Sequence, residues 1–229
     1  MTKLFLIIPI LAYGISLNAQ LSTRFHADVE THYSIPINEF SNANAKSVVR
    51  YSGFPNLTLR ENFHFGKVGF GLKTGLLNIG QIHRINDSIK LKQRAYVIPI
   101  GLQLNFGDVT DNFFYLGTQL NFAINYKQKT WINKTAKIKE NTWFSDDVNQ
   151  FNPTFFIGYN YSEQSGFQIQ YQYFNFFNEK KLFNFRGVNT YIKQSNFVSL
   201  VFTTRINSKA VNEKFEHDDA KDVEILMMK

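Results

Sequence analysis

The feature that most constrains this chain is an alternation of apolar and polar residues with a period of two. It is clearest between Arg24 and Ile35, where apolar or small side chains alternate with charged and polar ones. Successive side chains of a β-strand point to opposite faces of the sheet, whereas an α-helix would mix the two sets on one surface. The segment therefore predicts a strand with one apolar wall and one charged wall.

Seven more segments have the same period. We expect these strands at 54–65, 68–76, 95–106, 114–126, 155–161, 167–173 and 195–206. Proline has no N–H to donate to a β-ladder, so we expect a bulge or a lost hydrogen bond near Pro99.

The connections between these segments are alternately long and short. The long ones lie near 37–51, 79–90, 127–150 and 175–190, and the short ones near 66–67, 107–112 and 162–166. An up-and-down barrel with its long loops at one end produces this alternation, and a Greek-key sandwich does not. The sequence predicts an all-β fold, an eight-stranded antiparallel up-and-down transmembrane β-barrel.

The residue types on the two faces indicate which face points outward. The polar faces carry Gly, Asn, Gln and charges that fit a narrow lumen, while the apolar faces are rich in Leu, Ile, Phe and Tyr. A soluble lipocalin-like ligand carrier would need the reverse, and it remains the main alternative. Aromatic residues near strand ends predict two girdles. The outer rim would hold Tyr33, Phe54, Tyr126, Tyr171 and Tyr173, and the periplasmic rim Phe25, Phe65, Phe106, Phe114, Tyr161 and Phe167.

The two ends of the chain differ from the strands. Lys3, an apolar run and small residues up to Ala19 predict a signal peptide at 1–19, which leaves 20–206 for the barrel. Residues 207–229 are highly charged, and we expect a charged periplasmic tail there. The sequence contains no cysteine, which excludes disulfides, thiolate metal sites and an acylated N-terminal cysteine.

Charged residues on the polar faces predict a packed lumen that is closed to solutes. A tight turn that pairs Phe65 with Val68 sets Arg60 opposite Lys73, and we expect Glu30 on the other flank of Arg60. Buried charges without partners are unfavourable, so a cluster of these three is expected. Further polar side chains are expected in the lumen, namely His26, Asp28, His32, Gln103, Gln119, Gln168, Gln170 and Gln172.

Two residue patterns also fit a metal site or a catalytic site. The four alternating residues from His26 to His32 are metal-ligand types, but alternate strand residues lie roughly 6.6 Å apart and cannot converge on one ion. His32 and Ser34 suggest a membrane-embedded hydrolase or acyltransferase, yet nothing in the sequence fixes a base beside a nucleophile. We expect no enzyme activity, no metal and no cofactor, with the hydrolase kept as the less favoured alternative.

The third long connection is basic and aromatic. Its candidate contact residues are Lys129, Trp131, Lys134, Lys137 and Trp143. Such side chains suit lipopolysaccharide phosphates or a protein partner, although a solvated loop explains them as well. The net charge of +7 is spread along the sequence without a compact stripe, so no nucleic-acid partner is expected. A protein partner could also bind the periplasmic tail.

The segment Tyr96-Val-Ile-Pro-Ile-Gly-Leu-Gln-Leu-Asn-Phe106 and the residues Asn18-Ala19-Gln20 resemble the PorT-like family of outer-membrane β-barrel domains. More loosely, the chain is similar to the small barrels of the OmpA and OmpX type. The resemblance implies an integral barrel in the outer membrane of a gram-negative bacterium, and some family members support protein secretion. With both termini in the periplasm, we expect a structural, adhesive or secretion-accessory protein that contacts outer-membrane lipid.

Overall fold

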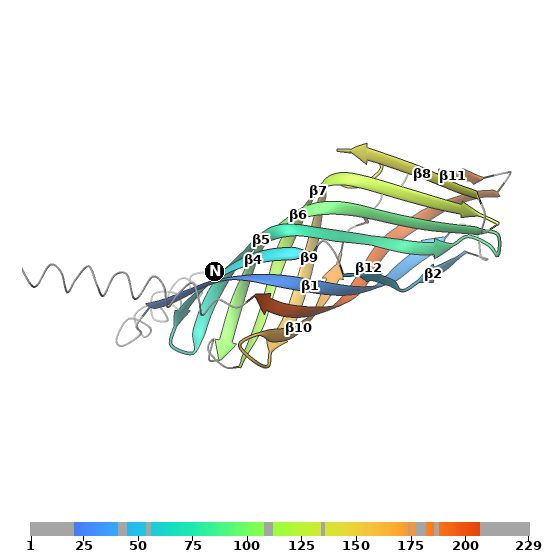
Figure 1. The fold of residues 1–229 in the computed structure, drawn as a ribbon. Helices are drawn as coiled ribbons and strands as arrows, with labels where there is room; N and C mark the ends of the chain where they lie inside the picture. Colours follow the sequence, from blue (N-terminus) through green and yellow to red (C-terminus); the bar gives the residue numbers. More distant parts are fainter. Residues whose placement is uncertain are drawn as a thin grey trace, which may run out of the picture.

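Eight strands close into a ring in the computed structural model, which describes residues 21–40, 45–53, 56–107, 112–133, 136–173, 175–176, 182–185 and 188–206. The ring is formed in order by β1 (Leu21–Phe40), β4 (Leu57–Phe65), β5 (Val68–Arg84), β6 (Ile89–Gly107), β7 (Phe113–Ile132), β9 (Phe151–Asn160), β10 (Ser165–Gln172) and β12 (Val188–Ile206). Neighbours pair antiparallel, and β12 returns to pair with β1 (Figure 1). In that pairing Asp28 lies opposite Arg205. The predicted eight-stranded up-and-down barrel is confirmed.

The alternation places apolar side chains on the outside of the ring. Each ring strand contributes at least one, for example Phe25, Leu57, Phe70, Ile100, Phe114, Phe155, Ile169 and Phe202. Ile100 is 65% exposed, whereas Gln103 on the opposite face of the same strand is 4% exposed. Among the residues that the structure describes, no helix is long and apolar enough to cross a membrane.

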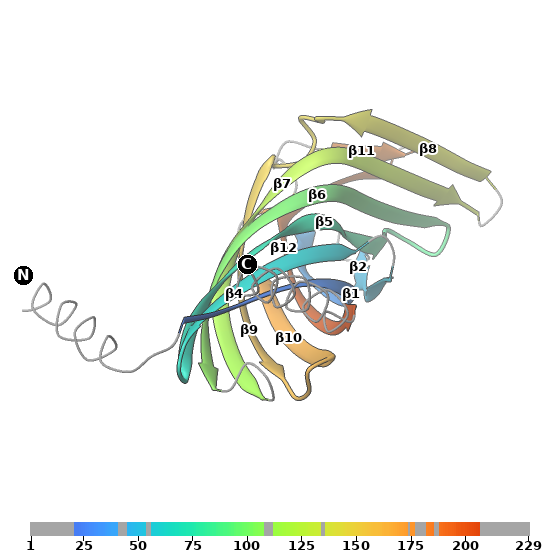
Figure 2. The ribbon, with the colours of Figure 1, turned by 60° about the vertical axis from the view of Figure 1, so that its left-hand side comes forward.

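The two ends of the barrel differ in how far their strands extend. At one end, β5 and β6 run on to Arg84 and Ile89, so only residues 85–88 join them, and the predicted long connection at 79–90 is wrong. β7 likewise continues to Ile132 and pairs with β8 (Ala136–Trp143) to form a hairpin (Figure 2). This is the extended end. The opposite end, where Gly66 and Lys67 join β4 to β5, is the turn end.

Short strands also occupy the two other predicted long connections at the extended end. β2 (Lys46–Val48) pairs with β5, β3 (Arg50–Ser52) pairs with β1, and β11 (Leu182–Phe185) pairs with β12. The barrel wall is thus prolonged by strands where the sequence predicted loops.

The polarity of the strands inverts at the extended end. There the outward positions of β5 and β6 carry the basic residues Arg84, Lys90, Lys92 and Arg94, and the buried inward positions carry Leu77, Ile79, Leu91, Ala95 and Val97. The period of two continues, but the apolar face now points into the barrel, as in a sheet of a soluble protein. The predicted strands are therefore too short at the extended end, because their ends were placed at the last outward apolar residues.

A β-bulge in β7 shifts the phase of its alternation. Val97 pairs with Ala123 and Tyr96 pairs with Asn125, so Ile124 has no cross-strand partner in this ladder. An extra residue in one strand of a pair moves every later side chain to the other face.

Tyr126 is consequently inside the barrel, 1% exposed, and does not join the outer girdle as predicted. Its hydroxyl donates to Gln128 at 2.8 Å and accepts from Gln93 at 3.1 Å. The bulge also lies away from its predicted place, because Pro99 pairs in register with Asn121.

The remaining described girdle residues are exposed on the outer wall. Toward the extended end these are Tyr33, Tyr171 and Tyr173, and toward the turn end Phe25, Phe65, Phe106, Phe114, Tyr161 and Phe167. Phe54, the predicted signal peptide at 1–19 and the predicted tail at 207–229 lie outside the described residues.

Candidate functional site

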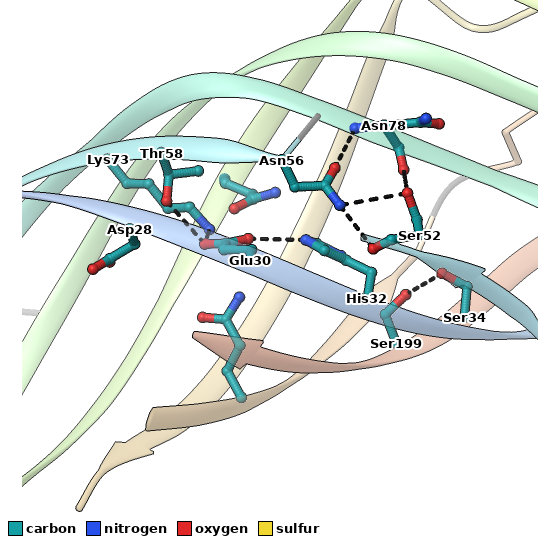
Figure 3. Close-up of polar contacts among 12 residues, drawn as sticks. Asp28, Glu30, His32, Ser34, Ser52, Asn56, Thr58, Lys73, Asn78 and Ser199 are labelled. Atoms are coloured by element: carbon teal, nitrogen blue, oxygen red, sulfur yellow. Dashed lines mark hydrogen bonds and ion pairs between the residues drawn. The ribbon is translucent and has the colours of Figure 1, made fainter. Parts of the chain in front are cut away.

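The lumen brings together the three charged residues that the sequence singled out. Lys73 Nζ lies 2.6 Å from Glu30 Oε1, and Arg60 Nη2 lies 3.0 Å from the same oxygen (Figure 3 shows Glu30 and Lys73). All three side chains are buried. Arg60 lies opposite Lys73 as expected, but on β1 it lies opposite His26 and reaches Glu30 diagonally.

A second carboxylate, Asp28, extends the cluster toward the turn end. Arg60 Nε lies 2.9 Å from Asp28, and Arg205 Nε lies 3.5 Å from it. His26 Nε2 is 3.6 Å from the same carboxylate. Arg205 was not predicted in the cluster, because its contact depends on the register in which β12 closes against β1.

The two residues of the hydrolase alternative have different hydrogen-bond partners. His32 Nε2 lies 2.9 Å from Glu30 Oε2, and the Ser34 hydroxyl shares a hydrogen bond of 2.9 Å with Ser199 (Figure 3). Glu30 also accepts a hydrogen bond from Thr58 at 3.1 Å. These contacts hold His32 in a packed network. Within the described part of the chain, no group of three or more His, Asp or Glu side chains is placed to hold a metal ion.

The glutamines predicted for the lumen are buried there and crosslink the strands. Gln103 accepts from Arg60 at 3.2 Å, and Gln168 accepts from the Tyr115 hydroxyl at 3.2 Å. Gln119 donates to Asn121 and Gln172 to Asn152, and Gln170 is buried beside them on the inward face of β10. The bonds of Gln103 and Gln168 each join two strands that are separated by one strand of the ring, whereas the bond of Gln119 lies within β7.

The lumen also contains two apolar clusters, which were not predicted from the sequence. The cluster at the extended end contains Leu77, Ile79, Leu91, Ala95, Val97, Ala123, Tyr126, Val148, Phe176 and Phe197. Val148 and Phe176 come from segments between strands, and the Asn149 N–H donates to the Phe176 carbonyl at 3.1 Å.

The cluster at the turn end contains Phe113, Tyr115 and Phe156. Arg60 lies 5.4 Å from the Tyr115 ring centroid, and Lys73 lies 5.7 Å from that of Phe156. The lumen therefore contains apolar clusters beside its charged and polar side chains, rather than being polar throughout as predicted.

The predicted contact residues of the third connection lie on a strand hairpin instead of a loop. Lys129 and Trp131 belong to β7, Lys137 and Trp143 belong to β8, and Lys134 lies outside the described residues. The pairing register puts the four described residues on one face of the hairpin, where Lys137 Nζ lies 5.6 Å from the Trp131 ring centroid.

This face continues across β6 and collects basic residues that are scattered in the sequence. We define the basic face as Lys90, Lys92, Arg94, Lys127, Lys129, Lys137 and Lys139, with Trp131 among them. Burial and the neighbouring cations, first among them Arg94, lower the pKa of Lys129. Repulsion of this kind is relieved when an anion binds.

No protein-family model and no curated protein matches the sequence. Among solved structures, the attachment invasion locus protein Ail of Yersinia pestis is 9% identical, with 80% of this chain and 97% of that chain covered and a TM-score of 0.35. OprG, an outer-membrane protein of Pseudomonas aeruginosa, is 12% identical, with 80% and 96% covered and a TM-score of 0.36. The porin NanC is 8% identical, with 79% and 100% covered and a TM-score of 0.21. These likenesses are weak, and the strand pairing described above establishes the barrel without them.

Proposed function

We propose that this protein is an integral outer-membrane β-barrel of a gram-negative bacterium, with a closed lumen and a structural, adhesive or secretion-accessory role. The observation that carries the proposal is the combination of an outward apolar wall with a lumen filled by side chains. A membrane strand needs about 9–11 residues to cross the hydrocarbon core. β4, with nine residues, has the length of one crossing and exposes apolar side chains at both of its ends.

The orientation follows from the two ends of the barrel. β1 begins and β12 ends at the turn end. In outer-membrane barrels the short turns face the periplasm and the long connections face outward. We infer that both termini are periplasmic and that the extended end, with the basic face, is outside the cell.

The basic face is the part of the protein best suited to bind a partner. It combines seven cations with an indole and lies beyond the apolar wall, where lipopolysaccharide phosphates or an acidic protein would meet it. A secreted lipocalin-like carrier would need an apolar cavity open to a ligand, and a hydrolase would need a base beside a nucleophile. The filled lumen and the separate partners of His32 and Ser34 favour neither.

The first experiment tests membrane insertion and closure together. We expect the protein in the outer-membrane fraction, with a gel mobility that changes on boiling, and no steady conductance when it is reconstituted in planar bilayers. Recovery in the soluble periplasmic fraction, with no mobility change on boiling, would overturn the membrane assignment. Stable open-channel currents would overturn the closed lumen.

A second experiment tests the orientation. Because the sequence has no cysteine, single cysteines report one position each. Lys137→Cys on β8 should react with a membrane-impermeant maleimide on intact cells, and the matched variant Gln164→Cys at the turn end should react only after permeabilisation. The opposite labelling pattern would reverse the orientation.

A third experiment tests the basic face. Replacing Lys129, Lys137 and Lys139 with glutamine should weaken binding to lipopolysaccharide-containing vesicles, while Lys67→Gln at the turn end should leave binding unchanged. Equal binding by both variants would remove the basic face as the contact surface.

A further inference from the structure

The barrel wall is divided at one place near the extended end. Among the described residues, β3 pairs only with β1 and β2 only with β5, so no continuous ladder joins β1 to β5 in this part of the wall. Side chains join the two sides instead. The Ser52 hydroxyl donates to the Asn78 carbonyl at 3.0 Å, and Asn56 Oδ1 accepts from the Asn78 N–H at 2.7 Å (Figure 3).

A notch of about 420 Å³ opens at this division and is lined mainly by Arg50, Ser52, Asn78, Lys92 and Arg94. Three of these residues are cationic, and no carboxylate among the described residues lines the notch. The cations come from β3, which pairs with β1, and from β6, which pairs with β5 on the other side of the division. The fold therefore assembles a local excess of positive charge on either side of a gap.

Arg50 is the buried cation of the notch. It is 1% exposed, and its Nη1 donates to the Asn78 carbonyl at 3.1 Å. Its Nε is buried and has no hydrogen-bond partner in the described part of the chain, and the same holds for Arg94 Nε. Buried donors normally have acceptors, so two orphaned guanidinium nitrogens in one notch point to an acceptor that binds there.

Electrostatics in the notch agree with this geometry. Burial and the proximity of Arg94 lower the pKa of Arg50 to about 10. Burial, Arg50 and Arg94 also lower the pKa of Lys92. The charged forms of Arg50 and Lys92 are thus destabilised by the neighbouring cations, and a bound anion would reverse that effect.

We propose that this notch binds a phosphoryl group carried by a membrane lipid. A tetrahedral oxyanion offers several acceptors to the forked donors of arginine, which is the geometry that arginine recognises best. The notch also lies beside the exposed rings of Tyr33 and Tyr51, whose centroids are 5.3 Å apart at the edge of the apolar wall. A phosphate in the notch would leave its acyl chains against that wall, so the lipid part of the proposal rests on the proposed function.

The test uses the folded full-length mature protein in a neutral detergent, with dodecyl phosphate and inorganic phosphate as separate probes. Binding is measured by calorimetry and by the ³¹P resonance of each probe. We expect dodecyl phosphate to bind at least about tenfold more tightly than inorganic phosphate, because its chain contacts the apolar wall. Equal affinities for the two probes would overturn the lipid-borne assignment.

Variants locate the binding. Arg50→Gln and Lys92→Gln should each weaken dodecyl phosphate binding about tenfold or more, the usual effect of losing one charge-assisted hydrogen bond. Lys67→Gln, at the turn end, is the matched control and should bind as the wild type does. Among the described residues Lys92 makes no hydrogen bond whose loss would affect the wall, so Lys92→Gln keeps the test valid where Arg50→Gln fails to fold.

Two results would overturn the site. One is binding that neither notch variant weakens. The other is binding that Lys129→Gln and Lys139→Gln abolish while both notch variants retain it, because the phosphate would then lie on the β7 and β8 part of the basic face rather than in the notch. Each variant is first checked for its mobility change on boiling, so a loss of binding in folded protein leaves the membrane proposal standing.

Discussion

At the scale of single residues, Glu30 is the central acceptor of the lumen. Its carboxylate is within hydrogen-bond distance of Lys73, Arg60, Thr58 and His32. We expect Glu30→Gln to lower the free energy of unfolding by about 3–5 kcal/mol, because it leaves buried cations uncompensated. Urea unfolding in micelles, followed by gel mobility, measures this.

The control for that variant is Glu163→Gln, which removes a partly exposed carboxylate 3.9 Å from Arg24 at the turn end. Exposed pairs of this kind contribute at most about 1 kcal/mol. Equal losses of stability for the two variants would contradict a central role for Glu30.

Glu61 is a single acid on the outward face of β4, midway along the strand. It lies between Phe25 and Leu72 on the neighbouring strands and lines a groove of about 380 Å³ on the apolar wall. We expect Glu61→Leu to raise the free energy of unfolding in lipid bilayers by about 1–2 kcal/mol, since a lipid-facing carboxyl is unfavourable there. The free energy of unfolding of Glu61→Gln should lie between those of the wild type and Glu61→Leu. A loss of stability on Glu61→Leu would contradict the placement of this residue against lipid.

His83 supplies a pH dependence at the extended end. Burial lowers its pKa from 6.5 to about 3, against the opposing effect of a hydrogen bond with Gln93. The folded protein then keeps His83 neutral while the unfolded chain takes up a proton below pH 6.5. Stability contributed by this residue is complete above about pH 6.5 and falls by up to about 1.4 kcal/mol per pH unit as the pH drops toward 3.

The measurement is histidine NMR of labelled protein in micelles, with the His83 signal assigned by its loss in His83→Gln. At pH 5 a histidine with an ordinary pKa is mostly protonated, and His83 should still be neutral. A midpoint near 6.5 for this signal would show that the side chain is open to solvent.

At the scale of elements, β5 depends on a close backbone approach at Gly75. Its φ is +150°, and a Cβ there would lie 2.2 Å from the Leu57 carbonyl oxygen. We expect Gly75→Ala to cost about 1–3 kcal/mol in backbone strain and a similar amount in overpacking. Gly66→Ala is the control, because that turn glycine has φ +65° but no atom within 4 Å. Urea unfolding should show the larger loss for Gly75→Ala, and the reverse order would contradict it.

The strands show how much of the fold could be predicted from the sequence. All eight ring strands were predicted, because outward apolar residues alternate through each. Their ends at the extended end were wrong, because Leu77, Ile79 and Leu91 continue the same period with the apolar face turned inward. The bulge at Ile124 was not predicted either. It arises because β7 has one residue more than β6 at this point, and the sequence around Ile124 does not reveal how β6 pairs with it.

The candidate site was also predicted only in part. Alternation and one tight turn were enough to place Arg60 opposite Lys73 and to direct Glu30 inward. The contacts of Arg205 and Arg50 depend on how β12 meets β1 and how β3 meets β5, and pairings between distant segments cannot be deduced from either segment alone.

At the scale of the whole molecule, the ring is closed only by β12. This strand pairs with β10 on one side and with β1 on the other, and it brings Ser199 against Ser34, 165 positions earlier. A chain that ends before Val188 should form no species whose mobility changes on boiling, because two unpaired edges remain. A chain that ends at Ile206 should form one, and a folded product from the shorter chain would contradict closure at this seam.

The inversion of polarity along β5, β6 and β7 also determines how deep the barrel sits. The charged outward residues Lys92, Arg94 and Lys127 are continuous with the wall beneath them and cannot enter hydrocarbon without a large penalty. The depth of the barrel is therefore limited at the extended end, and the described residues of the turn end place no comparable row of cations on the outer wall. In the proposed orientation, a thicker or thinner bilayer should be accommodated by tilting of the barrel and deformation of the inner leaflet, while the outer leaflet keeps its position against these cations.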